Sequence, residues 1–198
     1  GNNLSLYIAE NSKEYIGIDL SDIAIEKLSK KLSHLPNAKA LAVDFLSDDD
    51  FPDSEFDIIY AYGVLHHFQN VNLLIDRLNL KLAKDGVIIS YDPLETSLPV
   101  KLVRILYRPF QSDKDWEWPF TKKTFQSFES SFDIVERRGV IGKIKWFFVI
   151  KLLPISKSKK NAIGKAWNLS DWEESSHSLN KMFSCMHLTM KMKKKSIN

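Results

Sequence analysis

The chain has 198 residues, 44% of them hydrophobic, which is enough for the core of one domain of ordinary size. Its formal net charge of +3 is too small to indicate nucleic acid, and no uncharged apolar run is long enough to span a bilayer. The single cysteine, Cys185, excludes an internal disulfide and indicates a reducing compartment. No signal peptide is visible, so we expect a cytoplasmic protein.

Strands alternate with helices through the first half of the chain. Helical spacing of apolar residues predicts a helix at 3–11, another that Ser21 or Asp22 caps, and a third through 73–82 that Asp85-Gly86 ends. Apolar runs predict strands at 15–19, 38–43, 56–61 and 87–91, and the acidic stretch 48–53 is expected to be a loop. This alternation predicts an α/β fold, with a parallel sheet and helices on both faces.

The pattern changes after Pro93. Residues 94–128 contain three prolines and the cluster Trp116-Glu117-Trp118, which indicates an inserted lid. A strand is expected at 132–138, and the alternation at 186–192 predicts a last strand at the edge of the sheet. We therefore expect one domain over 1–198, with a cofactor-binding half at 1–93, the lid at 94–128, and a C-terminal sheet half and substrate region at 129–198.

Asp19 closes the first predicted strand and stands directly before a helix start. In open α/β sheets, ligands bind outside the carboxyl ends of the strands. Two carboxylate oxygens can accept two adjacent hydroxyl donors, such as those of a ribose. The sequence thus indicates a cofactor that carries a nucleoside, while a solvated carboxylate that caps the helix is the plainer interpretation.

Four segments together resemble the class I S-adenosylmethionine-dependent methyltransferases. They cover roughly the first half of the chain, in the family's order and spacing, and only the ordered set is specific. The resemblance implies a Rossmann-like sheet and S-adenosylmethionine as the cofactor. The segments are Tyr15-Ile16-Gly17-Ile18-Asp19-Leu20-Ser21, Val43-Asp44-Phe45, 56–68 and 82–89.

One part of the family pattern is absent. The family opens with a strand and a glycine-rich turn that holds the methionine part of the cofactor, and this strand does not occur in the sequence. Gly1 stands where the last glycine of that turn would fall. We therefore expect an N-terminal truncation, with the first strand of the sheet missing.

The resemblance also implies roles for individual residues. Asp19 would hold the ribose hydroxyls, Leu20 would lie against the adenine, and Asp44 would accept from the adenine amino group beside Phe45. Gly1 and Tyr62 complete the implied cofactor-binding set. Two of these residues have a structural alternative here: Leu20 as a core residue, and Asp44 as a carboxylate in a turn.

His66 and His67 follow the third predicted strand, at the sheet end where a substrate pocket is expected. Histidine can serve as a general base near neutral pH, and His66 is our candidate catalytic residue. Methyl transfer needs mainly alignment of the nucleophile with the methyl group, so a structural role at the pocket wall is an equal alternative. No metal site is expected, because adjacent histidines point differently and no third ligand is evident.

Two aromatic clusters have open interpretations. Trp116, Trp118 and Phe120 could line a substrate pocket or form a small core under the lid. Residues 143–153 combine Lys143, Lys145 and Lys151 with Trp and Phe, a composition that suits either a membrane interface or a core helix with snorkelling lysines.

The resemblance therefore implies methyl transfer to an O, N or C nucleophile of a small molecule, and the basic apolar segment 143–153 makes a saccharide or lipid-linked acceptor one form of it. Peripheral membrane contact through 143–153 is the expected partner interaction, and nucleic acid is not expected. Two alternatives stay open: an NAD-dependent oxidoreductase, because Asp19 also suits an NAD ribose, and a methyltransferase-like protein that binds without catalysis.

Overall fold

The computed structural model describes residues 4–47, 55–111 and 115–195. The chain divides into two compact units, residues 1–54 and 55–198, which we call the N-terminal and C-terminal units. Each unit is described by itself. Gly1 and the acidic stretch 48–53 lie outside the described residues, so their predicted roles stay predictions.

The N-terminal unit contains two parallel strands and two helices. Strand β1 pairs with β2 so that Asp19, the last residue of β1, lies opposite Ala42, the last residue of β2. The Ser21 hydroxyl accepts a hydrogen bond from the Ala24 backbone N–H at 3.3 Å, which confirms the predicted cap. The elements are α1 (Leu4–Glu10), β1 (Tyr15–Asp19), α2 (Asp22–Leu32) and β2 (Ala38–Ala42).

The C-terminal unit is built on a mixed four-stranded sheet in the order β3-β4-β6-β5. Strands β3 and β4 are parallel, whereas β6 is antiparallel to both of its neighbours. The sheet is therefore mixed where the sequence predicts a parallel one. The strands are β3 (Phe56–Tyr62), β4 (Leu82–Pro93), β5 (Phe132–Val140) and β6 (His187–Lys194).

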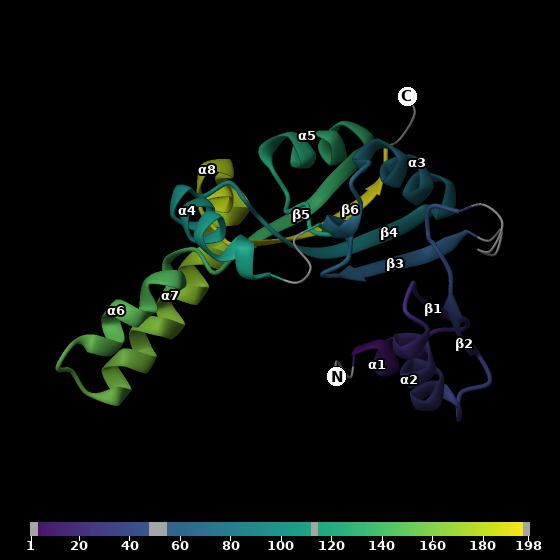
Figure 1. Cartoon of the computed structure of the whole chain (residues 1–198), viewed down its shortest axis with the longest axis horizontal. Helices are drawn as coiled ribbons and strands as arrows, with labels where there is room; N and C mark the ends of the chain where they lie inside the picture. Colours follow the sequence, from purple (N-terminus) through teal and green to yellow (C-terminus); the bar gives the residue numbers. More distant parts are fainter. Residues whose placement is uncertain (1–3, 48–54, 112–114, 196–198) are drawn as a thin grey trace. The chain divides into compact units, whose positions relative to one another are not determined.

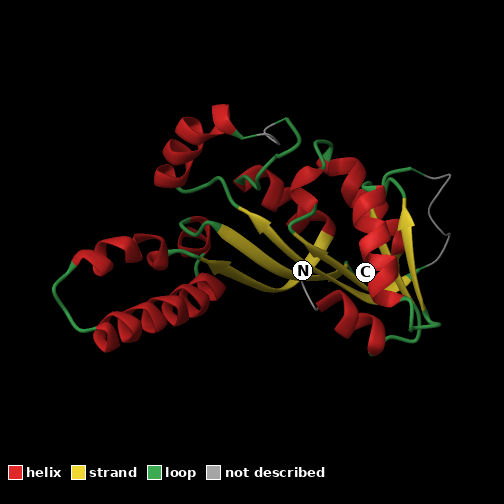
Figure 2. Ribbon diagram, turned by 60° about the horizontal axis from the view of Figure 1, so that its bottom comes forward, coloured by secondary structure: helices red, strands yellow, loops and turns green. Residues whose placement is uncertain are grey.

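Helices surround this sheet unevenly. In Figure 1, α3 and α5 lie together along one side of the strands, whereas α6 and α7 run side by side and project away from them. Figure 2 shows the same projecting pair from another direction. The helices are η1 (Leu65–His67), α3 (Val71–Lys81), α4 (Leu98–Tyr107), η2 (Arg108–Phe110), α5 (Lys122–Ser131), η3 (Lys143–Trp146), α6 (Phe147–Leu152), α7 (Lys157–His177) and α8 (Leu179–Phe183).

The prediction of an edge strand at 186–192 is wrong. Strand β6 lies between β4 and β5, and Leu188, Met190 and Met192 on it are buried. Alternation in a sequence shows that one face of a strand is buried, but it carries no information on how many neighbours the strand has. The edges of this sheet are β3 and β5.

The predicted stop of the third helix at Asp85-Gly86 is also misplaced. Helix α3 ends at Lys81, and β4 begins at Leu82, so Asp85 and Gly86 lie within the strand. The register of β3 against β4 shifts between Phe56 and Ile58, as at a bulge, which accommodates the extra residues. The turn-forming residues therefore mark a strand irregularity instead of a helix end.

The last part of the predicted lid belongs to the core of the C-terminal unit. Phe120, Phe125 and Phe128 are all buried, and the rings of Phe120 and Phe128 stack with their centroids 5.4 Å apart. Helix α5, which carries two of them, begins inside the range 94–128 and continues to Ser131. Helix α4 differs, because most of its apolar side chains are exposed.

Candidate functional site

Two carboxylates follow the paired strands of the N-terminal unit at the same end. Asp19 is the last residue of β1, and its carbonyl accepts the Val43 N–H at 3.1 Å, directly before Asp44. Because β1 and β2 are parallel, this end is the carboxyl end of both strands. Both aspartates are exposed. The geometry therefore brings together the two acids that the sequence assigned to one ligand.

Each of these carboxylates is held by its own backbone. Asp19 Oδ1 accepts the Ser21 N–H at 2.8 Å, and Asp44 Oδ1 accepts the Leu46 N–H at 2.9 Å. Such two-residue turns fix the carboxylate without using its second oxygen. In the described part of the unit, no partner is found for either Oδ2, so each carboxylate keeps an oxygen for a ligand donor.

Leu20 and Phe45 flank these acids. The Leu20 side chain is 73% exposed, so the alternative that Leu20 is a core residue is wrong in this unit. Phe45 is half-buried. An exposed leucine beside an exposed carboxylate gives an apolar surface next to a polar anchor, an arrangement that fits a nucleoside.

The C-terminal unit carries a buried polar pair where β3 and β4 end. Gly63, with φ of 65°, turns the chain out of β3 into η1, a backbone conformation that suits glycine. His66 in η1 is 6% exposed and Asp92 near the end of β4 is fully buried. Asp92 Oδ1 lies 3.0 Å from His66 Nδ1 and also accepts the His66 backbone N–H at 3.1 Å. Asp92 thus fixes both the ring and the backbone of His66.

A second carboxylate lies on the other side of the His66 ring. Glu117 Oε1 is 3.9 Å from His66 Nε2, and Glu117 Oε2 is 3.7 Å from Arg104 Nη1 on α4. A neutral ring that donates Nδ1–H to Asp92 leaves Nε2 as an acceptor for a ligand donor, since the Glu117 carboxylate is itself an acceptor. A small cavity of about 50 Å³ adjoins this point, with Glu117 and Arg104 among its lining residues.

Aromatic rings form a stack across three neighbouring strands at the same place. Tyr91 lies between Tyr62 and His187, with centroid distances of 4.7 Å and 5.1 Å. Burial raises the pKa of Tyr91, and the neighbouring Tyr62 adds to the effect. Burial also lowers the pKa of His187, with further lowering by the charges of Arg104 and His66. Tyr62 is 54% exposed, so one side of the stack is open.

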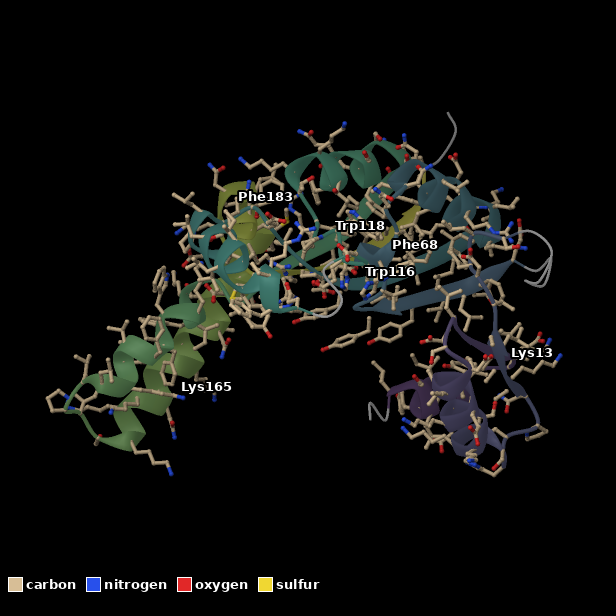
Figure 3. All side chains as sticks on the ribbon, viewed as in Figure 1. Lys13, Phe68, Trp116, Trp118, Lys165 and Phe183 are labelled. Carbon is tan, nitrogen blue, oxygen red and sulfur yellow. The ribbon has the colours of Figure 1, made fainter. Side chains whose placement is uncertain are left out.

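The tryptophans 116 and 118 attach the segment before α5 to η1. The Trp118 N–H donates to the His66 carbonyl at 2.8 Å, and His67 Nδ1 lies 2.7 Å from the Trp116 carbonyl. Figure 3 shows both tryptophans near Phe68, the residue that follows η1. Trp116 is 69% exposed, whereas Phe120 is buried in the core. Phe120 is therefore a core residue, whereas the exposed Trp116 could still line a substrate pocket.

Other candidate sites are few. No group of three or more His, Cys, Asp or Glu side chains that could hold a metal occurs within 4–47, 55–111 and 115–195. None of the helices that the structure describes is long and apolar enough to cross a membrane. A larger open groove of about 530 Å³ lies between the start of α3 and α5, and its lining contains none of the predicted site residues.

Sequence reasoning missed two residues of the C-terminal cluster, Asp92 and Glu117. Asp92 had a usable signal, because it is a carboxylate at the end of an apolar strand, as Asp19 is. Glu117 had none beyond its place between two tryptophans, since its approach to His66 depends on tertiary packing over 51 positions of chain.

Comparison with known proteins adds an independent observation. A family model described as "Methyltransferase domain" matches residues 1–88. The match covers less than half of the 198-residue chain, so residues 1–88 are similar to that family. The resemblance to class I methyltransferases found in the sequence is confirmed.

One curated relative and two solved structures are similar to this chain. A probable thiol methyltransferase of Arabidopsis thaliana is 41% identical over 65 residues, which are 31% of this chain and 28% of that protein. The N-methyltransferase NodS from Bradyrhizobium japonicum, in complex with S-adenosyl-L-homocysteine, gives a TM-score of 0.58 at 13% identity, over 96% of this chain and 71% of that one. The YcgJ protein from Bacillus subtilis gives 0.59 at 18% identity, over 97% and 87%.

These likenesses have different weights. At 13–18% identity the solved structures show the fold alone, and the Rossmann-like methyltransferase fold is confirmed. The chain spans well under two thirds of the curated relatives that it matches.

Proposed function

We propose that the chain is a class I S-adenosylmethionine-dependent methyltransferase that acts on a small-molecule acceptor. The observation that carries the proposal is the pair Asp19 and Asp44, which end adjacent parallel strands inside the stretch that matches the methyltransferase domain. NodS, which has the same fold, was crystallised with S-adenosyl-L-homocysteine, and that product fits the same choice of cofactor here.

The donor set of the N-terminal unit fits the adenosine part of such a cofactor. The Asp19 carboxylate suits two ribose hydroxyls, because Oδ2 is unused and Oδ1, which accepts the Ser21 N–H, has a second lone pair. Asp44 suits the adenine amino group, with the exposed Leu20 and the half-buried Phe45 as apolar contacts for the ring. Gly1, which lies outside the described residues, and Tyr62, which belongs to the C-terminal unit, stay predictions.

His66 is the proposed proton acceptor for the nucleophile. The bound cofactor would supply an electrophilic methyl group. Asp92 holds the His66 ring through Nδ1 and keeps Nε2 available to take a proton from an acceptor O–H or N–H. Glu117, which lies 3.9 Å from Nε2, and Arg104, which pairs with Glu117, would bind polar groups of the acceptor. A role of the histidine as a pocket wall is the competing proposal, because the ring is 6% exposed.

The acceptor class is the finer part of the proposal. An O, N or C nucleophile, on a saccharide or a lipid-linked small molecule, stays our expectation. The matched relative from Arabidopsis thaliana is a probable thiol methyltransferase, so a thiol belongs in the same substrate panel. A thiol is more acidic than an alcohol and needs less help from a base, so activity on thiols should depend less on His66.

Calorimetry tests the cofactor choice. Titration with S-adenosyl-L-homocysteine should give micromolar binding, and titration with NAD should give none. Asp19→Ala should weaken binding by about 1–3 kcal/mol, because hydrogen bonds to a charged group are lost. Asp22→Ala is the matched control, since this exposed aspartate lies three positions away in the first turn of α2.

Three outcomes distinguish the alternatives. Unchanged affinity of Asp19→Ala would remove Asp19 from the site. Binding of NAD without S-adenosyl-L-homocysteine would favour the oxidoreductase. Binding of S-adenosyl-L-homocysteine without methyl transfer to any acceptor in a panel of alcohols, amines, carbon nucleophiles and thiols would favour the non-catalytic protein.

A further inference from the structure

The helical hairpin formed by η3, α6 and α7 is anchored at its base and free at its tip. At the base, the buried Asp171 carboxylate on α7 accepts the backbone N–H groups of Gly142, Lys143 and Ile144 at 2.7–3.3 Å. Beyond the base the two helices project away from the sheet (Figures 1 and 2). Within 147–169, only Gly164 is buried. The hairpin is therefore an arm that is anchored at its base and has very little of its surface inside the protein.

One face of α6 packs on α7 and the other is apolar and open. A Cβ on Gly164 of α7 would come within 3.1 Å of the Phe147 ring, so the two helices meet closely at this point. Phe147 and Ile150, three positions apart, are half-buried. The opposite face is exposed and consists of Phe148 (57%), Val149 (44%), Leu152 (81%) and Leu153 (43%), with Trp146 (44%) just before it.

Beyond its base, the arm carries charge of one sign. Residues 141–170 contain seven lysines and no Asp, Glu or Arg. Lys143 is committed to the base, where it pairs with Glu174, and Lys145 donates to the Ser184 carbonyl at 2.6 Å. Lys157, Lys159 and Lys165 are exposed, and no carboxylate partner for them occurs in the described part of the chain. Figure 3 shows Lys165 on α7, in the projecting arm.

We propose that the α6–α7 arm docks on an anionic lipid surface. Exposed leucine, phenylalanine and tryptophan side chains bury at the boundary of acyl chains and headgroups, and the neighbouring ammonium groups attract anionic lipid. A second copy of the chain is a poorer occupant, because two arms with the same excess of lysine repel one another. Nucleic acid would use the lysines but would leave Leu152 and its apolar neighbours in water.

Vesicle sedimentation of the full 198-residue chain tests this proposal. Vesicles of phosphatidylcholine with 30% phosphatidylglycerol should bind the chain, vesicles of phosphatidylcholine alone should bind it much more weakly, and 1 M salt should reduce binding to the anionic vesicles. Replacing Lys157, Lys159 and Lys165 with Gln should weaken binding to anionic vesicles by about 100-fold, at roughly 1 kcal/mol for each lysine.

Two controls separate local docking from general charge. The triple variant of Lys84, Lys191 and Lys193 to Gln removes the same charge from exposed positions on β4 and β6, and it should bind nearly as the wild type does. The pair Phe148→Ser and Leu152→Ser should lose more than tenfold in affinity, whereas the exposed pair Leu73→Ser and Leu80→Ser on α3 should not.

Three results would overturn the proposal. One is sedimentation to the same extent with both vesicle types, or an equal loss of binding in the two triple lysine variants. Another is the detection by light scattering of a dimer that the variant Phe148→Ser, Leu152→Ser dissociates, which would identify a second copy of the chain as the occupant. The third is salt-sensitive binding of a random oligonucleotide that the arm lysines control and the apolar pair does not. None of these readouts depends on methyl transfer.

Discussion

The two groups of acidic residues in this chain are held in opposite ways. Asp19 and Asp44 in the N-terminal unit are exposed, and each is fixed by a backbone N–H two residues along the chain. Asp92 in the C-terminal unit is fully buried and is fixed by His66, which lies 26 positions away. Local turns keep Asp19 and Asp44 available to a ligand, whereas the position of Asp92 depends on the fold around it.

Because of this difference, the exposed aspartates can be tested for a role in ligand binding without a large effect on folding, whereas Asp92 cannot. Removing an exposed carboxylate leaves the backbone turn exposed to water, which can replace the lost hydrogen bond at little cost. Removing a buried partner leaves the other polar group without one in a medium of low dielectric. Variants of Asp92 should therefore lower the stability of the fold, whereas variants of Asp19 and Asp44 should leave stability nearly unchanged. Effects on activity should be compared only after this difference in stability has been measured.

The largest effect is expected for Asp92→Ala. The change removes the partner of both the ring and the backbone N–H of His66, and we expect the free energy of unfolding to fall by about 3–5 kcal/mol. Urea denaturation measures this loss. Asp76→Ala on the exposed side of α3 is the control, with a change within about 0.5 kcal/mol. Equal effects of the two variants would mean that the His66–Asp92 contact does not stabilise the C-terminal unit.

The next effect concerns His66 itself. If His66 takes a proton from the nucleophile, His66→Gln should lower kcat by about 10²- to 10⁴-fold and leave the affinity for S-adenosyl-L-homocysteine unchanged. His67→Gln is the matched control, because this neighbouring histidine is exposed. Loss of stability with kcat retained in the folded fraction would instead assign His66 to the pocket wall.

The same contrast explains what the sequence could predict. Asp19 is the last residue of its strand and accepts the N–H of a residue two positions away, so pattern and local chemistry predict its place. Ser21 as the helix cap and the first three strands were predicted for the same reason. These features depend on neighbours within a few residues, which a sequence displays openly.

The parts that escaped prediction depend on distant partners. The pairing of Asp92 with His66 and the approach of Glu117 to the same ring join segments that lie 26 and 51 positions apart. The interior position of β6 is set by its pairing with β4 and β5, across a similar or greater length of chain. Alternation and composition are silent on such pairings, because they report burial without naming the neighbour.

Glu174 combines features of the exposed and the buried carboxylates, and its removal is expected to have the smallest effect of the variants considered. More than a third of its side chain is exposed, as with the acids of the N-terminal unit, yet it has side-chain partners from distant segments, as Asp92 has. Hydrogen bonds from Lys143, then Ser170 and Lys181, lower the pKa of Glu174 to about 2. If tertiary partners matter even at the surface, this group should make stability depend on pH.

The sign follows from the direction of that shift. Because the pKa of Glu174 is lower in the folded chain than its ordinary value of 4.5, its contribution is complete above that value and is lost as the pH falls toward 2. The difference in urea midpoint between the wild type and Glu174→Gln should be constant from pH 7 to 5 and should narrow from pH 4.5 downward. Salt should reduce it, because the group is exposed. When Glu174→Gln is compared with its parent in the Lys143→Gln background, the difference in urea midpoint should be smaller at every pH, because the main hydrogen-bond donor to Glu174 is absent. A difference that stays constant to pH 3 would show that Lys143 and Glu174 do not interact in solution, and the base of the arm would then depend on Asp171 alone.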